Sequence, residues 1–135
     1  RGRGAQHNDK RMRVSKPTAI PATRMAMSLP ETWLRPSHLP AYLTITQQLA
    51  PQVETLVATG SGLLDMCELA AGRVDSVFVL GLEEQDMQVG TLLLKEAGAL
   101  MGTPDGKPTV NAESQLMAAG PRLYKALIKQ LAPHF

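Results

Sequence analysis

The chain has 135 residues, of which 44% are hydrophobic, and a formal net charge of +2. This length and composition predict one globular domain that buries roughly two-thirds of the surface its unfolded form exposes. No apolar run approaches the ~20 residues that a membrane-spanning helix needs, and the first residues lack a signal-peptide core. The single cysteine, Cys67, cannot form an internal disulfide and has apolar neighbours, as expected of a core thiol. We therefore expect a soluble, cytoplasmic protein with no membrane partner.

The charge is unevenly distributed along the chain. Residues 1–16 carry six basic side chains and one acidic side chain, which leaves eight basic and eleven acidic residues in positions 17–135. A basic segment on a mildly acidic body can attract phosphates or nucleic acid. Stacking on bases needs aromatic side chains, however, and none of the five aromatic residues lies in that segment. Nucleic acid is therefore not the expected partner.

The first half of the chain predicts a hairpin, two strands and a helix. The hairpin falls in residues 1–16, where apolar and basic residues alternate after the turn pair Asn8-Asp9. Residues 22–29 predict a strand, and the proline-bearing residues 30–40 predict a loop that places Pro40 in the first turn of a helix. That helix is expected to run to about residue 50, followed by a short strand over residues 54–59.

The second half predicts three helices and the remaining strands. Residues 60–73 have helical spacing, with Leu63, Met66, Cys67 and Ala70 inside, Asp65 and Glu68 outside, and Gly72 at the end. A strand is expected over residues 75–82. The helix predicted over residues 85–99 is apolar around much of its circumference, which favours a position sandwiched between layers.

The C-terminal part completes the fold. Strands are expected at residues 99–101 and 114–120, with a turn at Pro104-Asp105-Gly106. The last helix opens at Pro121 and is expected to bury Tyr124, Leu127, Ile128 and Leu131. Alternating strands and helices with some hairpin character predict an α/β layered sandwich with a mixed sheet.

An acidic cluster lies where the strand at residues 75–82 gives way to a helix. Asp86 stands just before an apolar helix, where a carboxylate commonly caps the first backbone amides. The same carboxylate suits Mg²⁺, which proteins bind through one or two carboxylates together with phosphate oxygens and water. Both roles stay open for Asp86 from the spacing alone. Glu83 and Glu84 are interpreted as solvated loop charges.

A glycine-rich turn is the second candidate site. Residues 59–62, Thr-Gly-Ser-Gly, join a strand to the start of a helix, and amides in such a turn can bind an anion. The turn lacks the Gly-Lys-Ser/Thr ending of a phosphate loop, so a purely structural turn is the alternative. The three histidines form no close-spaced ligand pair, and Ser61 has no local base or nucleophile-elbow motif. These features argue against a zinc site and a serine hydrolase.

The order of the segments resembles the C-terminal half of the inositol monophosphatase family, which are magnesium-dependent, lithium-sensitive phosphatases of sugars and nucleotides. The resemblance is carried by "TGSGLLDMCELAAGRVDSVFVLGLEEQDMQVGTLLLKEAGALMGTPDGKP" and "MAAGPRLYKALIKQL", while "RGRGAQHNDKRMRVS" resembles the hairpin that precedes that half. It is weakest over residues 17–53. The resemblance implies that residues 1–16 belong to the end of an N-terminal half and residues 17–135 form a C-terminal α/β domain.

The resemblance also implies site residues. The family's magnesium-binding Asp, which follows a Trp at a helix N-terminus, corresponds to Asp86. The turn beside the substrate ring corresponds to Gly60, Ser61 and Gly62. Three positions depart from the family pattern: Gln85 replaces the Trp, Val79 replaces a substrate-contacting Glu, and Val57 or Ala58 replaces an arginine common in bacterial members. A pocket without that Glu and arginine is expected to hold inositol phosphate poorly.

The family's other metal ligands, a Glu-Glu pair and an Asp-Pro-x-Asp-Gly-Thr/Ser motif, do not occur in these 135 residues. The resemblance therefore implies half of a Mg²⁺-dependent phosphomonoesterase, with no catalytic residue in this chain and no activity in isolation. The expected substrate is inositol monophosphate or a related small phosphorylated polyol or nucleotide. A nucleotide-bisphosphate or histidinol-phosphate phosphatase and a non-catalytic protein- or RNA-interaction module are the alternatives. Self-association or a homodimer is expected, because the resemblance places part of the cover of the apolar helix in the missing half.

Overall fold

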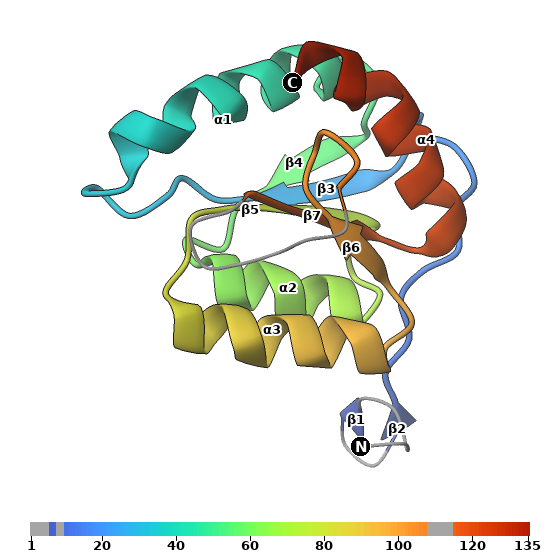
Figure 1. Ribbon diagram of the computed structural model, residues 1–135. Helices are drawn as coiled ribbons and strands as arrows, with labels where there is room; N and C mark the ends of the chain where they lie inside the picture. Colours follow the sequence, from blue (N-terminus) through green and yellow to red (C-terminus); the bar gives the residue numbers. More distant parts are fainter. Residues whose placement is uncertain (1–5, 8–9, 108–114) are drawn as a thin grey trace.

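The computed structural model describes residues 6–7, 10–107 and 115–135. The elements, in the order that Figure 1 traces, are β1 (Gln6–His7), β2 (Lys10–Arg11), β3 (Arg24–Met27), α1 (Arg35–Leu49), β4 (Thr55–Val57), α2 (Gly62–Ala70), β5 (Ser76–Leu80), α3 (Glu84–Glu96), β6 (Leu100–Gly102), β7 (Gln115–Ala119), α4 (Pro121–Leu131) and a 3₁₀ turn at Ala132–His134. No helix in these ranges is long and apolar enough to cross a membrane.

The main sheet has five strands in the order β4-β3-β5-β7-β6. β3 pairs in parallel with both β4 and β5, whereas β7 runs antiparallel to β5 and β6. The predicted mixed sheet is therefore confirmed. The parallel strands β3, β4 and β5 end at the same edge, where ligand sites of α/β proteins commonly lie.

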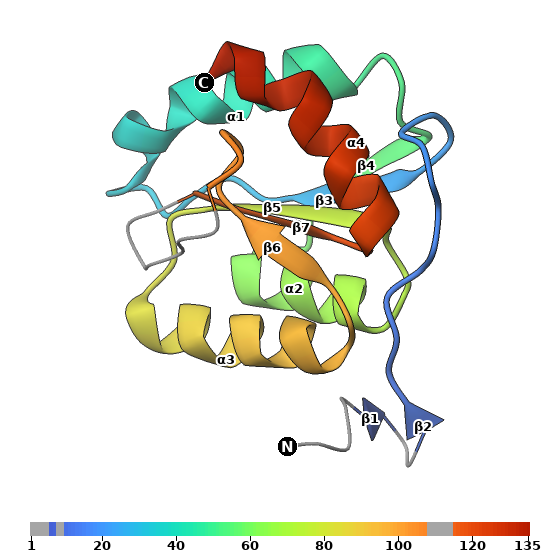
Figure 2. The ribbon, with the colours of Figure 1, turned by 45° about the vertical axis from the view of Figure 1, so that its right-hand side comes forward.

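Helices cover both faces of this sheet. Helices α1 and α4 lie over one face and α2 and α3 over the other, as both ribbon views show (Figures 1 and 2). The central strand β5 is buried on both sides: Val77 and Val79 pack toward α2 and α3, while Phe78 and Leu80 pack toward α1 and α4. This alternation follows the two-residue period of a strand and divides the interior into two apolar clusters. The α/β layered sandwich is confirmed.

Helix α1 begins earlier than the sequence predicted. The expected start was Pro40, but the helix opens at Arg35, with Pro36 in its first turn and Pro40 inside it. Pro36 fits the first turn, where its missing N–H is not needed. Pro40 removes one helical hydrogen bond, yet its exposed position lets solvent satisfy the carbonyl. The earlier start lengthens the helix and brings His38 over the sheet.

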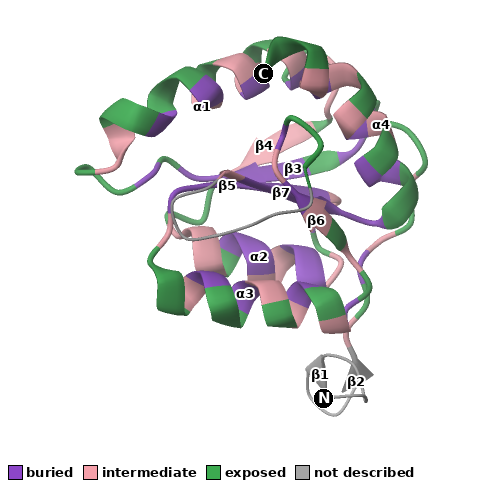
Figure 3. Cartoon of the chain, in the orientation of Figure 1, coloured by how far each residue is buried: buried purple, intermediate pink, exposed green. Residues whose placement is uncertain are grey.

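Among the described residues, other elements cover only one face of helix α3. Its inner face packs on α2 at Gly90, where an added Cβ would collide with the Met66 sulfur. Its outer face exposes Val89 and Leu92, which keep 55% and 42% of their accessible surface. Figure 3 shows this exposed side of α3. In this chain by itself the helix therefore lies on a surface rather than between two layers.

The predicted burial of helix α4 was also too extensive. Ile128, expected to be buried, is only half-buried, whereas Leu123 is buried.

The N-terminal segment forms the expected hairpin and then joins the domain. Strand β1 pairs antiparallel with β2, and the turn Asn8-Asp9 between them lies outside the described residues. Beyond β2, the Val14 N–H donates to the Ala97 carbonyl over 3.1 Å, and the Ser15 hydroxyl donates to the Asp75 carboxylate over 2.5 Å. The assignment of residues 1–16 to a separate N-terminal half stays a prediction.

Candidate functional site

The Thr-Gly-Ser-Gly turn connects β4 to α2 and caps that helix. Ser61 is the N-cap residue, and its hydroxyl accepts the Leu64 N–H over 3.3 Å. Gly60 has a φ of +93°, a left-handed conformation that favours glycine. The Gly60 N–H donates to the Ser28 hydroxyl, and the Ser61 N–H donates to the Thr59 hydroxyl. These two amides are therefore engaged within the protein, and the anion-binding donors left by this turn are the first amides of α2 itself.

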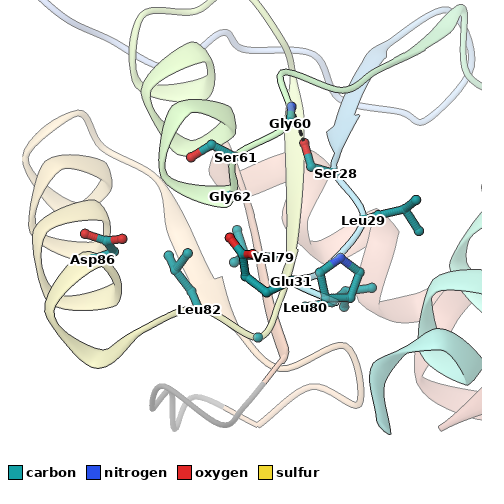
Figure 4. A pocket seen from close by; sticks show the side chains of 12 residues that line it. Ser28, Leu29, Glu31, Gly60, Ser61, Gly62, Val79, Leu80, Leu82 and Asp86 are labelled. Carbon is teal, nitrogen blue, oxygen red and sulfur yellow. Dashed lines mark hydrogen bonds between the residues drawn. The ribbon is translucent and has the colours of Figure 1, made fainter. Parts of the chain in front are cut away.

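A buried carboxylate holds the turn in place. Asp65 is fully buried in α2, where its Oδ1 accepts the Thr59 N–H over 3.1 Å and the Thr59 hydroxyl over 2.7 Å. Its Oδ2 accepts the Ser28 hydroxyl over 2.6 Å. Ser28 in turn accepts the Gly60 N–H, as drawn in Figure 4. The prediction that Asp65 lies outside the helix packing was wrong, because a carboxylate with three donors around it is stable in the interior.

Asp86 lies in the first turn of α3 and is not the helix cap. The N-cap position belongs to Glu83, whose side chain makes no capping hydrogen bond. Of the two roles that the spacing left open for Asp86, the capping role is therefore wrong, since the helix begins before it. The ion pairs formed by the described residues, Glu68 with Arg73 and Asp105 with Lys107, leave Asp86 out. Its half-buried carboxylate is available to a ligand and lies at the positive end of the α3 dipole.

One pocket brings the predicted site residues together. Asp86 and all of Gly60, Ser61 and Gly62 line it. Figure 4 shows Ser61 and Asp86 arriving from the N-terminal ends of two different helices, α2 and α3. The pocket has a cavity volume of about 70 Å³ and lies beyond the carboxyl ends of β3 and β5. The two helix N-termini give it a positive backbone field that suits an anion such as phosphate.

Ser28, Glu31 and Val79 also line the pocket. Ser28 and Glu31 come from the β3–α1 connection; the sequence predicted Ser28 near the end of a strand over residues 22–29 and Glu31 in the loop over residues 30–40. A signal for them was present, because a segment directly after a parallel strand lies at the ligand edge of the sheet. Val79, identified as a departure from the family pattern, is 2% exposed on β5. Glu83, Glu84, Gln85, Val57 and Ala58 are not among the described residues that line the pocket.

The carboxylates of the pocket fit part of the ligand set of a magnesium site. Within residues 12–107 and 115–135, no three His, Cys, Asp or Glu side chains are grouped closely enough to hold a metal ion. Asp86 and Glu31 nevertheless contribute two carboxylates to one pocket. Mg²⁺ is commonly bound through one or two carboxylates together with phosphate oxygens and water. Asp86 therefore fits the role of a single ligand to an ion whose other ligands come from elsewhere.

His38 supports the pocket from the far side. This buried side chain of α1 lies against Gly81, where an added Cβ would come within 2.9 Å of the imidazole ring. Gly81 lines the pocket and has a φ of +84°. The amide of Gln115 lies 3.4 Å from His38 Nδ1. Burial lowers the pKa of His38 from its usual value of 6.5, because the charged imidazolium loses hydration.

This lowered pKa predicts a loss of stability in acid. Below pH 6.5 the unfolded chain binds a proton at His38 that the folded chain resists, so the free energy of unfolding falls as the pH decreases toward the lowered pKa. We expect His38→Gln to show a shallower decline than the wild-type chain between pH 7.5 and 5. Urea unfolding at a series of pH values measures this, and parallel declines for the two proteins would contradict the role of His38.

The geometry defines an α/β protein with a pocket at the carboxyl edge of its parallel strands, where ligand sites of such proteins commonly lie. Comparison with known proteins identifies the class: the sequence profile of the inositol monophosphatase family matches residues 1–134, and the chain belongs to that family. It is 32% identical over 134 residues to the Nus factor SuhB of Pseudomonas aeruginosa, covering 99% of this chain and 49% of that protein. The Nus factor SuhB of Escherichia coli K12 is also 32% identical, over 131 residues that cover 97% of this chain and 48% of that protein.

Solved structures agree with the fold. The extragenic suppressor protein suhB of Bartonella henselae superimposes with a TM-score of 0.86 at 27% identity, over 99% of this chain and 51% of that one. The inositol monophosphatase of Anabaena sp. PCC 7120 also superimposes with a TM-score of 0.86. Its sequence identity is 23%, over 98% of this chain and 52% of that one. The chain spans about half the length of the curated relatives that it matches. This share agrees with the predicted correspondence to one half of the family's fold.

Proposed function

We propose that this chain supplies one wall of a Mg²⁺-dependent phosphomonoesterase site that acts on a small phosphate ester. Asp86 is a metal ligand in this proposal, and Gly60 to Gly62 contact the substrate beside its phosphate. The observation that carries it is the convergence of these four residues, from two separate helix N-termini, on one pocket. Membership of the inositol monophosphatase family supports the same assignment.

The chain's own residues bind and orient the ester. The first amides of α2 and α3 have no helical acceptor, so they donate toward phosphate oxygens, and both helix dipoles favour the negative charge. The Asp65 network fixes Thr59 and Gly60, which keeps the first turn of α2 in register with the pocket. A bound Mg²⁺ ion supplies neutralisation of the phosphate charge and a water of lowered pKa. Further carboxylates must come from outside the described residues, and the proposal assigns no catalytic base here.

Magnesium binding by the 135-residue chain tests the assignment of Asp86. We expect Mg²⁺ to shift the amide NMR signals of residues 60–62 and 84–87, and Asp86→Asn to weaken this binding by about 10–100-fold, since loss of even an outer partner of a metal ligand has that effect. Glu84→Gln is the matched control, because it removes an exposed carboxylate from the same helical turn outside the pocket. Equal binding by Asp86→Asn and Glu84→Gln would refute the proposed metal ligand.

A non-catalytic role is the second candidate, and the name of the two relatives above, Nus factor SuhB, favours it. In this alternative the family fold serves as an interaction module, and the basic segment of residues 1–16 provides attraction for an acidic partner. The magnesium experiment separates the two candidates. Specific Mg²⁺ binding at Asp86 favours the phosphatase, whereas Mg²⁺ binding that Asp86→Asn leaves unchanged favours the interaction module.

A further inference from the structure

We propose that the exposed side of helix α4, together with the segment beside its start, binds an acidic protein segment that carries an apolar side chain. Four basic residues form this surface, which we call the α4 basic surface: Lys16, Arg122, Lys125 and Lys129. The inference does not rest on the proposed function, because none of the four is among the described residues that line the pocket of Asp86.

The basic residues of α4 share one side of the helix. Arg122, Lys125 and Lys129 follow one another at spacings of three and four, which places them on the same face, and all three are exposed. The buried residues of the helix occupy the other side: Leu123, Tyr124, Leu127 and Leu131. Figure 3 shows the exposed side of α4 turned away from the sheet. It lies over the opposite sheet face from α3, whose apolar side is expected to be covered by the missing half.

The charge of the α4 basic surface is not neutralised by the described residues. Their ion pairs join Glu68 with Arg73 and Asp105 with Lys107, and so leave the surface out. No acidic residue stands in the first turn of α4, where Arg122 lies at the positive end of the helix dipole. A cation is unfavourable at that end. The surface therefore carries an electrostatic cost that an anionic partner would relieve.

A hollow of about 340 Å³ lies at the start of α4, between the helix and the N-terminal segment. It is lined by Lys16, Pro17, Gly120, Pro121 and Arg122. The two segments are packed closely, because a Cβ added to Gly120 would lie 2.6 Å from the Ser15 carbonyl oxygen. The two proline rings give the hollow apolar walls, and the two basic side chains flank them. This combination suits an apolar side chain with carboxylates next to it, as in an interface with an apolar centre and a polar rim.

The surface favours an acidic protein segment over nucleic acid. Binding of single-stranded nucleic acid commonly uses aromatic side chains on which bases stack. None of the residues of the surface or of the hollow is aromatic, and Tyr124 of α4 is only 8% exposed. Residues 17–120 carry five basic and eleven acidic side chains, so a long polyanion that extended beyond the surface would meet like charge. A short acidic segment meets only the complementary charge.

Fluorescence anisotropy tests the proposal with a labelled peptide of six glutamates and a central leucine, titrated with the 135-residue chain. We expect binding that weakens as salt is added. Arg122→Gln and Lys125→Gln are each expected to weaken it by about threefold, and replacing the peptide's leucine with glycine by about fivefold. Lys95→Gln is the matched control, because Lys95 is an exposed lysine of α3 on the other side of the sheet. Glutamine is a good helix former, so all three variants are expected to fold.

Equal losses in Lys125→Gln and Lys95→Gln would overturn the proposal, because they would reflect net charge alone. Absence of peptide binding, or binding that is indifferent to the peptide's leucine, would also overturn it. An oligouridylate of the same charge is the competing probe. If it bound more tightly than the peptide and lost affinity in Arg122→Gln and Lys125→Gln but not in Lys95→Gln, the surface would belong to nucleic acid instead.

Discussion

Replacing Asp65 with alanine is expected to lower the free energy of unfolding by about 1–3 kcal/mol, the cost of leaving a buried polar group without its hydrogen-bond partner. The carboxylate is fully buried and accepts three hydrogen bonds, from the Thr59 amide, the Thr59 hydroxyl and the Ser28 hydroxyl. Alanine leaves the buried Ser28 hydroxyl without this acceptor, whereas the exposed Thr59 can turn to water and its hydroxyl also donates to the Ser61 carbonyl. Each unsatisfied buried group costs about 1–3 kcal/mol.

Glu68→Ala in the same helix is the matched control. Glu68 forms a half-exposed ion pair with Arg73 over 3.2 Å, and such pairs contribute about 0–1 kcal/mol. Urea denaturation of both variants measures the difference. Asp65→Asn is expected to fall between them, because the amide oxygen still accepts from Thr59 while its NH₂ group faces the Ser28 hydroxyl. A loss for Asp65→Ala no greater than that for Glu68→Ala would show that the network does not stabilise the fold.

The same network determines the geometry of the candidate site. Thr59 and Gly60 are held through Asp65 and Ser28, so Asp65→Asn is also expected to move the turn that begins α2. This coupling explains why a residue outside the pocket lining belongs to its construction. Asp65 is thus a positioning residue for the Gly60 to Gly62 segment, whereas Asp86 acts at the pocket directly in the proposed function.

The sheet could be predicted from the sequence because apolar patterns report local periodicity. The continuous apolar run of β5 and the strand that became β7 both indicate full burial, and both are buried almost throughout. Helix boundaries were less predictable. Pro40 is a typical first-turn residue, but Pro36 is equally suited to that position, and solvent exposure of Pro40 decided between them in a way that local sequence does not encode.

The candidate site could be predicted only in part. The turn and Asp86 are visible as a glycine-rich strand-to-helix junction and a carboxylate at the next junction. Ser28 and Asp65 are distant in sequence, and their hydrogen bond depends on how β3 and α2 pack. A polar residue in a helix looks solvent-exposed until its partners are known. His38 was missed for the same reason, because its contact with Gly81 joins α1 to a loop 43 positions later in the chain.

Removing the apolar surface of α3 is expected to change the association state of the 135-residue chain. Val89 and Leu92 lie three residues apart, so they share the outer face of the helix, and both are more than 40% exposed. Leu64 of α2, 54% exposed, adds a third apolar side chain from the neighbouring helix. Exposed apolar side chains on two neighbouring helices of a protein favour association with another apolar surface.

Sedimentation velocity at tens of micromolar is the measurement. We expect the wild-type chain to self-associate and to bind a hydrophobic dye, and the double variant Val89→Gln, Leu92→Gln to sediment as a monomer with little dye binding. Glutamine is a good helix former, so the change acts on the surface rather than on helix stability. Leu43→Gln, on the outer face of α1, is the control for loss of an exposed apolar side chain elsewhere and is expected to leave association unchanged. A wild-type chain that is already a compact monomer without dye binding would show that this face is stable in water. If Leu43→Gln abolished association while the α3 double variant did not, the contact would lie on the opposite side of the sheet.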